Sequence, residues 1–378
     1  MLTLIENVHL YQPEDRGLAD ILFSCGKIVD IGLGLSSQYP TAERIPGEGF
    51  LAVPGYLDQH VHVTGGGGEG GFKTRVPELQ LSQCIRAGVT TLVGLLGTDG
   101  ITRSVENLVA KTKALNEEGI TAYCLTGSYE YPPVTLSGDL KKDIAFIHEV
   151  LGVKIAISDH RCSQPTKEEL IRLVSDVRMA ALIGGKPGIV TFHLGRGKAQ
   201  LGLILEILSE TDLPIKHFRP THIRSVQGQA LQFAQMGGYL DFTAGINPRE
   251  TANTIAKAAE AGVPLSQITL SSDSNGSLPK WNDKNEMVGI EAASMDALHE
   301  VIQALVLEEN MNISDALSLV TSNVSRALEF DGVKGKLEPG CDADLLLWDQ
   351  NLEISTVIAK GVILMQEGQL KVRGTFEK

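Results

Sequence analysis

FLAVPGYLDQHVHVTGGGGEGG, residues 50–71, joins an apolar run to two histidines and a glycine-rich loop. The apolar run has the length of a buried strand. His60 and His62 stand two residues apart at its end, a spacing that places both rings on one face of a strand. Glu69 is the single acid inside the glycine cluster. The stretch therefore predicts a buried strand that presents two imidazoles beside a flexible loop.

Seven more apolar runs of strand length follow, and helical stretches separate them. The runs are TTLVGLLG, AYCLTGS, VKIAISD, IVTFHLG, FRPTHI, YLDFTA and ITLSSDS; the helical stretches include residues 104–119, 166–184 and 295–310. Continuous apolar strands that alternate with helices indicate a parallel sheet covered by helices. Eight such units in about 270 residues predict an α/β fold of the (β/α)8, TIM-like barrel type.

The two ends of the chain have a different pattern. Short β-rich segments broken by turn residues occupy the first 53 residues, and the last part of the chain is similar. We expect residues 1–53 and 331–378 to form one small β-sandwich domain, and residues 54–330 to form the barrel.

Residues able to bind a metal ion stand at five of the expected strand ends. They are His60 and His62, Lys154, His193, His222 and Asp273. The carboxyl ends of barrel strands meet at one mouth, where function gathers in this fold. Neutral imidazole and carboxylate are good ligands for zinc and similar divalent ions. The sequence therefore predicts a metal site there, whereas His9, His148, His217 and His299 are expected to be structural.

Lys154 is the unusual member of this set. An ammonium group would be repelled by metal cations, but burial lowers the pKa of a lysine. A neutral amine can add carbon dioxide and become a carbamate, an anion able to bridge two metal ions. The alternative is an ordinary lysine whose stem packs at a strand end while its charge reaches water.

Composition excludes several classes of protein. The net charge of -13 and the absence of a basic run argue against nucleic acid as a partner. No apolar run reaches the ~18 residues of a membrane span, and the N-terminus does not resemble a signal peptide. The five cysteines form no CxxC pair, which favours reduced thiols in the cytoplasm. We therefore expect a cytoplasmic protein with no membrane partner.

The complete set of strand-end residues resembles the binuclear amidohydrolase superfamily. Several segments look like the isoaspartyl dipeptidase (β-aspartyl peptidase) family within it: DQHVHVTGGGGEGG, VGLLGTDG, LTGSYEYP, KIAISDHR, GGKPG, SSDSNGS, DADLLLWD and VRGTFEK. The resemblance runs over nearly the whole chain. It implies two zinc ions per subunit with a carbamate on Lys154 as their bridge, and metal-dependent hydrolysis of β-aspartyl dipeptides by a bridging hydroxide.

The resemblance also implies a role for each ligand. His60, His62 and Asp273 would hold the more buried ion, and His193 and His222 the second. Asp273 would also move the proton from the attacking hydroxide to the leaving amine. Tyr129 matches a family tyrosine that steadies the oxyanion. These roles define a zinc metallopeptidase.

Further family positions would bind a small zwitterionic dipeptide. Glu69 would pair with the free α-amino group, and Thr98 and Ser277 with the aspartyl α-carboxylate. Arg161 would bind a substrate carboxylate, because a guanidinium matches that group. The family places an arginine three residues after His222; Ser225 stands there, and Arg224 lies one residue earlier. We expect Arg224 to face the site and contact the carboxylate of the leaving residue. We also expect the protein to form a homo-oligomer.

Two other functions remain open from the sequence. A cyclic-amide hydrolase of the dihydroorotase or hydantoinase type would share every metal ligand but would not need Glu69. A metal-binding protein without catalysis is the second alternative. The proton-shuttling role of Asp273 counts against it, since that role serves turnover.

Overall fold

The computed structural model describes residues 2–245, 247–281 and 287–378. Within these residues, eight parallel strands form one sheet in the order β13-β12-β11-β10-β9-β8-β7-β6. They are β6 (Tyr56–Val61), β7 (Val89–Gly94), β8 (Thr121–Gly127), β9 (Val150–Ile157), β10 (Ile189–Leu194), β11 (Phe218–Thr221), β12 (Leu240–Thr243) and β13 (Ile268–Ser271). Each expected apolar run overlaps one of them, so the predicted barrel is confirmed.

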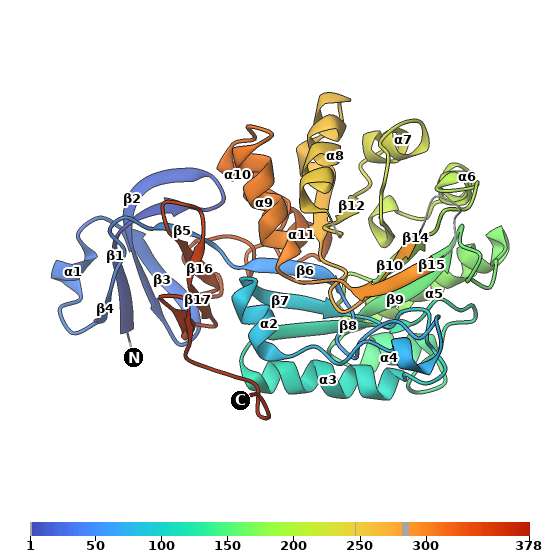
Figure 1. Cartoon of the computed structure of the whole chain (residues 1–378), viewed down its shortest axis with the longest axis horizontal. Helices are drawn as coiled ribbons and strands as arrows, with labels where there is room; N and C mark the ends of the chain where they lie inside the picture. Colours follow the sequence, from blue (N-terminus) through green and yellow to red (C-terminus); the bar gives the residue numbers. More distant parts are fainter. Residues whose placement is uncertain (1, 246, 282–286) are drawn as a thin grey trace.

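Helices surround this sheet (Figure 1). They are α2 (Leu81–Arg86), α3 (Val105–Glu118), α4 (Leu140–Phe146), α5 (Lys167–Gly184), α6 (Gly202–Glu210), α7 (Gln229–Gln235), α8 (Pro248–Glu260), α9 (Ala297–Leu307), α10 (Ile313–Ser318) and α11 (Ser322–Ala327). Local sequence fixes their ends. The Thr166 and Glu169 side chains form a capping box that begins α5, and Gly185 ends it in a left-handed conformation.

Backbone hydrogen bonds join the first and last strands of the barrel. The amide of His62 donates to the carbonyl of Ser274 at 2.9 Å, and the amide of Asp273 donates to the carbonyl of His60 at 3.1 Å. A parallel bridge between Val61 and Ser274 lies at the same seam. The seam therefore places His60 and His62 directly beside Asp273.

Both ends of the chain contribute to a second sheet, which in the described residues has nine strands. They are β1 (Leu2–Tyr11), β2 (Asp15–Ser24), β3 (Lys27–Gly32), β4 (Glu43–Pro46), β5 (Leu51–Pro54), β16 (Leu345–Trp348), β17 (Ile354–Ala359), β18 (Val362–Gln366) and β19 (Gln369–Leu370). Antiparallel pairing of β5 with β16 joins the two ends. The predicted β unit from both ends is thus confirmed, and its boundaries at 53/54 and 330/331 stay a prediction.

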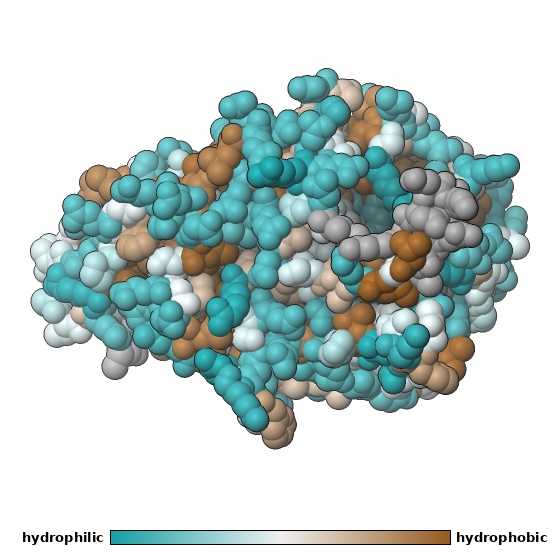
Figure 2. Space-filling model, viewed as in Figure 1, coloured by the Kyte–Doolittle hydropathy of each residue, from teal (hydrophilic) through white to brown (hydrophobic). Residues whose placement is uncertain are grey.

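Two smaller features complete the fold. A hairpin, β14 (Ser277–Trp281) and β15 (Met287–Ala292), follows the last barrel strand, and the short helix α1 (Leu35–Gln38) lies in the N-terminal part. Hydrophilic side chains cover most of the face in Figure 2, with apolar ones in scattered patches. Among the described residues, none of the helices combines the length and apolar character that crossing a bilayer requires.

Candidate metal centre and active site

The barrel mouth brings together all six residues expected to act as metal ligands. His60 lies on β6 and His62 follows it, Lys154 lies on β9, His193 on β10, His222 follows β11, and Asp273 follows β13. Strand geometry explains the gathering, because the carboxyl ends of parallel strands meet at one rim. Whether each residue binds metal remains a prediction.

His60, His62 and Asp273 form the most compact part of this cluster. Their nearest ligand atoms all lie within 4.8 Å of one another. The Oδ1 atom of Asp273 is 3.0 Å from Nε2 of His62 and 3.4 Å from Nε2 of His60. All three side chains are buried. Such a group of two imidazoles and one carboxylate is able to hold a divalent ion.

Lys154 is fully buried against this group. Its Nζ atom lies 3.2 Å from Nε2 of His60, and none of its surface reaches solvent. Burial lowers its pKa from 10.5 to about 7. A large part of the population therefore carries a neutral amine at neutral pH, which is the form that reacts with carbon dioxide.

His193 and His222 form the outer part of the cluster, with ring centroids 4.6 Å apart. Each ring has a partner that fixes its orientation. Nε2 of His193 lies 3.0 Å from Oδ2 of Asp159, and Nδ1 of His222 lies 2.7 Å from Oγ1 of Thr243. Burial lowers the pKa of His193 to about 3 and that of His222 well below its usual value. Both rings are therefore neutral, as metal-binding imidazoles must be.

The backbone at two of these residues is strained. His222 has φ 64° and Asp273 has φ 56°, in the left-handed region that side chains other than glycine rarely adopt. Such a conformation costs on the order of 1–3 kcal/mol and persists where the surrounding structure imposes it. Close packing adds to the constraint at Gly276, where a Cβ would lie 2.7 Å from the carbonyl oxygen of Asp273 and 2.9 Å from the His62 ring. The ligand geometry is thus set by the fold.

The chemistry of the cluster fits a metal ion. Burial lowers the pKa of His60 well below its usual value, which leaves its ring neutral. Burial alone would raise the pKa of Asp273, but the hydrogen bond with His62 and the nearby His222 lower it, so the carboxyl group is ionised. In the described part of the chain, the buried Nδ1 atoms of His60 and His62 have no hydrogen-bond partner. A neutral imidazole such as that of His60, beside an ionised carboxylate, is the donor form that a divalent cation requires.

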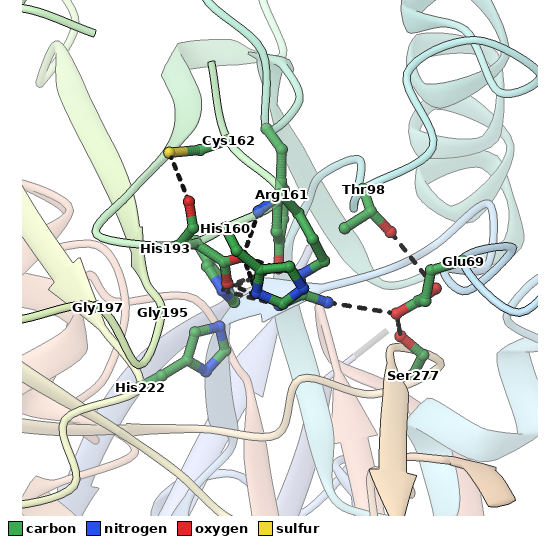
Figure 3. A network of polar contacts seen from close by, with 12 residues as sticks. Glu69, Thr98, His160, Arg161, Cys162, His193, Gly195, Gly197, His222 and Ser277 are labelled. Atoms are coloured by element: carbon green, nitrogen blue, oxygen red, sulfur yellow. Dashed lines mark hydrogen bonds and ion pairs between the residues drawn. The ribbon is translucent and has the colours of Figure 1, made fainter. Parts of the chain in front are cut away.

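Glu69 lies at the centre of a second network of polar contacts, which includes Thr98, Arg161 and Ser277 (Figure 3). Its Oε1 atom is 3.4 Å from Nη1 of Arg161 and accepts a hydrogen bond from the Ser277 hydroxyl. Its Oε2 atom accepts a longer one, 3.4 Å, from the Thr98 hydroxyl. Three of the residues expected to bind substrate, Thr98, Arg161 and Ser277, thus contact a fourth, Glu69. The glycine loop allows this approach: Gly65 has φ 76°, and a Cβ there would lie 2.0 Å from the Val76 carbonyl oxygen.

Arg161 links this network to the histidines through Asp159. Its Nη2 and Nε atoms lie 2.8 and 3.0 Å from the two carboxylate oxygens of Asp159. Tyr129 stands beside them, with its hydroxyl 2.7 Å from Nδ1 of His193. Burial raises the pKa of the Tyr129 phenol well above its usual value. The hydroxyl therefore stays protonated and available as a hydrogen-bond donor.

Both networks line one cavity of about 730 Å³, a size suited to a small molecule. Its wall includes most of the expected metal-binding side chains and all of those expected to bind substrate, Arg224 among them. Arg224 has no hydrogen bond or ion pair within the residues that the structure describes. Its position is compatible with the predicted contact to a substrate carboxylate, which remains a prediction.

Several residues at this site were not foreseen from the sequence. Asp159 orients both His193 and Arg161, and Thr243 orients His222. The cavity wall also contains His160, Arg196 and Glu250. Asp159 could have been predicted from the sequence. It ends the expected fourth strand, whose carboxyl end lies at the barrel mouth, and it precedes Arg161 by two residues. His160 and Arg196 lie on loops, whose direction the sequence pattern does not give, and Thr243 and Glu250 lie at the end of β12 and in the first turn of α8.

Comparison with known protein families gives the class of this fold and site. The model of the amidohydrolase family matches residues 51–364, which is most of the chain. The chain therefore belongs to the amidohydrolase family.

Solved structures narrow the comparison. The β-aspartyl dipeptidase of the thermophilic, keratin-degrading Fervidobacterium islandicum AW-1, in complex with the β-Asp-Leu dipeptide, is 45% identical, with a TM-score of 0.93 and complete coverage of both chains. Another structure of the Fervidobacterium islandicum AW-1 enzyme is 42% identical, also at complete coverage, with a TM-score of 0.90. An imidazolonepropionase of Stenotrophomonas maltophilia is 24% identical over 92% of this chain and 91% of its own length.

Proposed function

We propose that this protein is a metal-dependent β-aspartyl dipeptidase that hydrolyses the β-aspartyl bond of small dipeptides. The observation that carries the proposal is the Glu69 network beside the buried histidine cluster, in a chain 45% identical over its full length to a β-aspartyl dipeptidase. Glu69 supplies an anion for the substrate's free amine, and Arg161 supplies a cation for a carboxylate. A cavity with both charges suits a zwitterionic dipeptide.

The residues at the barrel mouth support a site for two zinc ions. His60, His62 and Asp273 would hold one ion, and His193 and His222 the other. Buried Lys154, as a carbamate, would contribute the anion shared by both. When bound, zinc lowers the pKa of water to about 7 and polarises a carbonyl group.

The protein's own side chains supply the remaining chemistry. Asp273 is ionised and accepts a proton at its carboxylate from the attacking water, then delivers it to the leaving amine. The Tyr129 hydroxyl donates a hydrogen bond to the oxygen that becomes negative in the transition state. Because its pKa is raised by burial, it keeps its proton throughout.

Further side chains on the cavity wall bind the charged groups of the dipeptide and position its β-aspartyl bond beside Asp273 and Tyr129. Glu69 pairs with the α-ammonium, and Thr98 and Ser277 contact the aspartyl α-carboxylate. Arg161 and Arg224 bind the carboxylate of the leaving residue. Cytoplasmic location and a homo-oligomeric state stay predictions.

The decisive experiment measures aspartate release from β-Asp-Leu by the purified protein. Release should occur with zinc bound, should stop on chelation and should return when zinc is restored. The α-linked dipeptide Asp-Leu serves as the control and should be hydrolysed far more slowly. Ring opening of dihydroorotate without aspartate release would favour a cyclic-amide hydrolase, and metal binding with neither reaction would favour a non-catalytic protein.

A further inference from the structure

Arg196 is a cation on the cavity wall that the proposed reaction does not use. It lies three residues after His193, on the loop that follows β10. Two backbone hydrogen bonds fix this loop against the end of β9: the amide of Gly195 donates to Ile157, and the amide of Gly197 donates to Ser158 at 2.6 Å. The glycines on both sides of Arg196 are therefore anchored (Figure 3), which holds its backbone in place.

Arg196 and Arg224 follow neighbouring strands of the barrel. In the parallel pair β10 and β11, His193 lies opposite Thr221. Arg196 follows His193 by three residues, and Arg224 follows Thr221 by three, so both arginines lie on the loops that leave these two strands at the barrel mouth. Both line the cavity. The charge of Arg196 acts on Arg224, as expected of two cations on one cavity wall.

The charges around these arginines are not balanced. Arg161 already has two carboxylate partners, Asp159 and Glu69. Neither Arg196 nor Arg224 has an ion pair among the described residues. Glu250, from the first turn of α8, lines the same cavity, but its carboxylate contacts neither of them in that part of the chain. Two guanidinium groups without an ion pair on one cavity wall can bind a second carboxylate.

A β-aspartyl dipeptide has one carboxylate on its leaving residue, unless that residue is itself acidic. Resting on the proposed function, we propose that Arg196 binds the side-chain carboxylate of the leaving residue and makes the enzyme prefer β-Asp-Glu and β-Asp-Asp over their neutral amide counterparts. Arg224 then holds the backbone carboxylate of the same residue. The substrate class is a dipeptide with an acidic leaving residue.

The test compares substrates that differ only in charge. The ratio of kcat/KM for β-Asp-Glu to that for β-Asp-Gln is measured in the parent protein, in Arg196→Gln and in Arg196→Lys. We expect a ratio of about 3 to 10 in the parent, because a charged pair at a partly exposed site has a modest strength. The ratio should fall to about 1 in Arg196→Gln and be largely kept in Arg196→Lys. The difference should lie in KM and should weaken with added salt.

Lys198→Gln is the matched control, since Lys198 is an exposed cation on the same loop that does not line the cavity. It should keep the parental ratio. A ratio near 1 in the parent, or an equal ratio in parent and Arg196→Gln, would overturn the inference. A preference for β-Asp-Lys over β-Asp-Glu and β-Asp-Gln would also overturn the inference, because Glu250 would then select the side chain of the leaving residue.

Failure of this inference can be separated from failure of the proposed function. If β-Asp-Leu is hydrolysed but replacing Arg196 does not change the ratio of kcat/KM for β-Asp-Glu to that for β-Asp-Gln, only the specificity assignment is wrong. If no β-aspartyl dipeptide is hydrolysed by the zinc-loaded protein, the proposed function is wrong and the specificity assignment with it.

Discussion

Two lysines are buried among the residues whose burial the structure describes, and their surroundings differ. Lys334, beside the sheet formed by both chain ends, is 4% exposed, and its Nζ atom lies 2.8 Å from Asp342 and 2.5 Å from Asp344. Lys154, in the barrel, is 0% exposed and contacts the His60 ring. No carboxylate lies within 4.0 Å of Lys154 in the described residues. One buried amine is paired with two carboxylates, and the other contacts an imidazole.

The pKa values of the two amines diverge accordingly. Burial acts to lower both of them. At Lys334 the charges of Asp344 and Asp342 outweigh burial and raise the pKa above 10.5. At Lys154 burial dominates and the pKa falls to about 7. A buried lysine is thus a structural cation or a reactive amine according to whether carboxylates surround it.

Replacing Lys154 should have the largest effect of the changes considered. In Lys154→Ala, we expect loss of most bound metal and a fall in β-Asp-Leu hydrolysis on the order of 10³-fold or more, since metal-based stabilisation contributes several kcal/mol. Metal analysis and steady-state kinetics measure both. Acetate or bicarbonate should restore part of the rate by supplying the missing anion. Full metal content with full activity would contradict a bridging role.

The same kind of change at Lys334 should affect stability instead. Lys334→Met leaves Asp342 and Asp344 without their buried partner, so the free energy of unfolding should fall by about 3 kcal/mol. Denaturant titration measures this loss, and the metal content of the folded fraction should stay at the parental level. Lys27→Met, which removes the half-exposed partner of Asp342, is the control and should cost less than about 1 kcal/mol. If Lys334→Met lost its metal but not its stability, the contrast between the two lysines would be wrong.

Glu69 tests whether a paired charge on the cavity wall serves structure or substrate. Glu69→Gln should slow hydrolysis of a free-amine β-aspartyl dipeptide by about 10- to 100-fold, because a charge-assisted contact contributes about 1.5–3 kcal/mol. The N-acetyl form of the same dipeptide lacks the ammonium and should be affected much less. Kinetics on both substrates decide the matter. Equal slowing of the free-amine and N-acetyl substrates would mean that Glu69 positions Arg161 rather than binding the substrate ammonium group.

The smallest expected effect is a pH dependence of the Lys334 cluster. Burial alone would raise the pKa of Asp342, but Lys334 and Lys27 hold it below its usual 3.8. Because the folded-state pKa is lowered, its stabilisation is present above pH 3.8 and is lost as the pH falls through the folded value. The difference in unfolding free energy between the parent and Lys334→Met should therefore stay constant near neutrality and shrink below pH 4. A difference that stays unchanged down to pH 3 would show that Asp342 does not share in the pair.

The barrel strands and their metal-binding ends were predictable because the signal is local. A run such as IVTFHLG carries its own apolar pattern, and the barrel rule then places His193, near the end of the run, at the mouth. Each expected ligand is fixed by its own strand in this way. The six side chains did gather at one mouth, although their roles as ligands stay predictions.

The contacts between loops could not be predicted in the same way. Ser277 and Glu69 are 208 residues apart and meet only because the barrel closes. The partnership of Arg161 with Glu69 depends on the direction of two loops, which the strand pattern leaves undetermined. Lys334 gave no signal at all, since one lysine near two acids in a β-rich segment is typical of an ordinary surface.

The seam between β6 and β13 has a consequence for synthesis of the chain. His62 and Asp273 are 211 positions apart in sequence, yet the hydrogen bonds that close the barrel also set them side by side. A nascent polypeptide on the ribosome lacks this pair until the eighth strand has emerged and docked onto the first. The compact His60, His62 and Asp273 group therefore cannot form before the eighth strand has docked, so a metal ion held by all three residues would report a closed barrel.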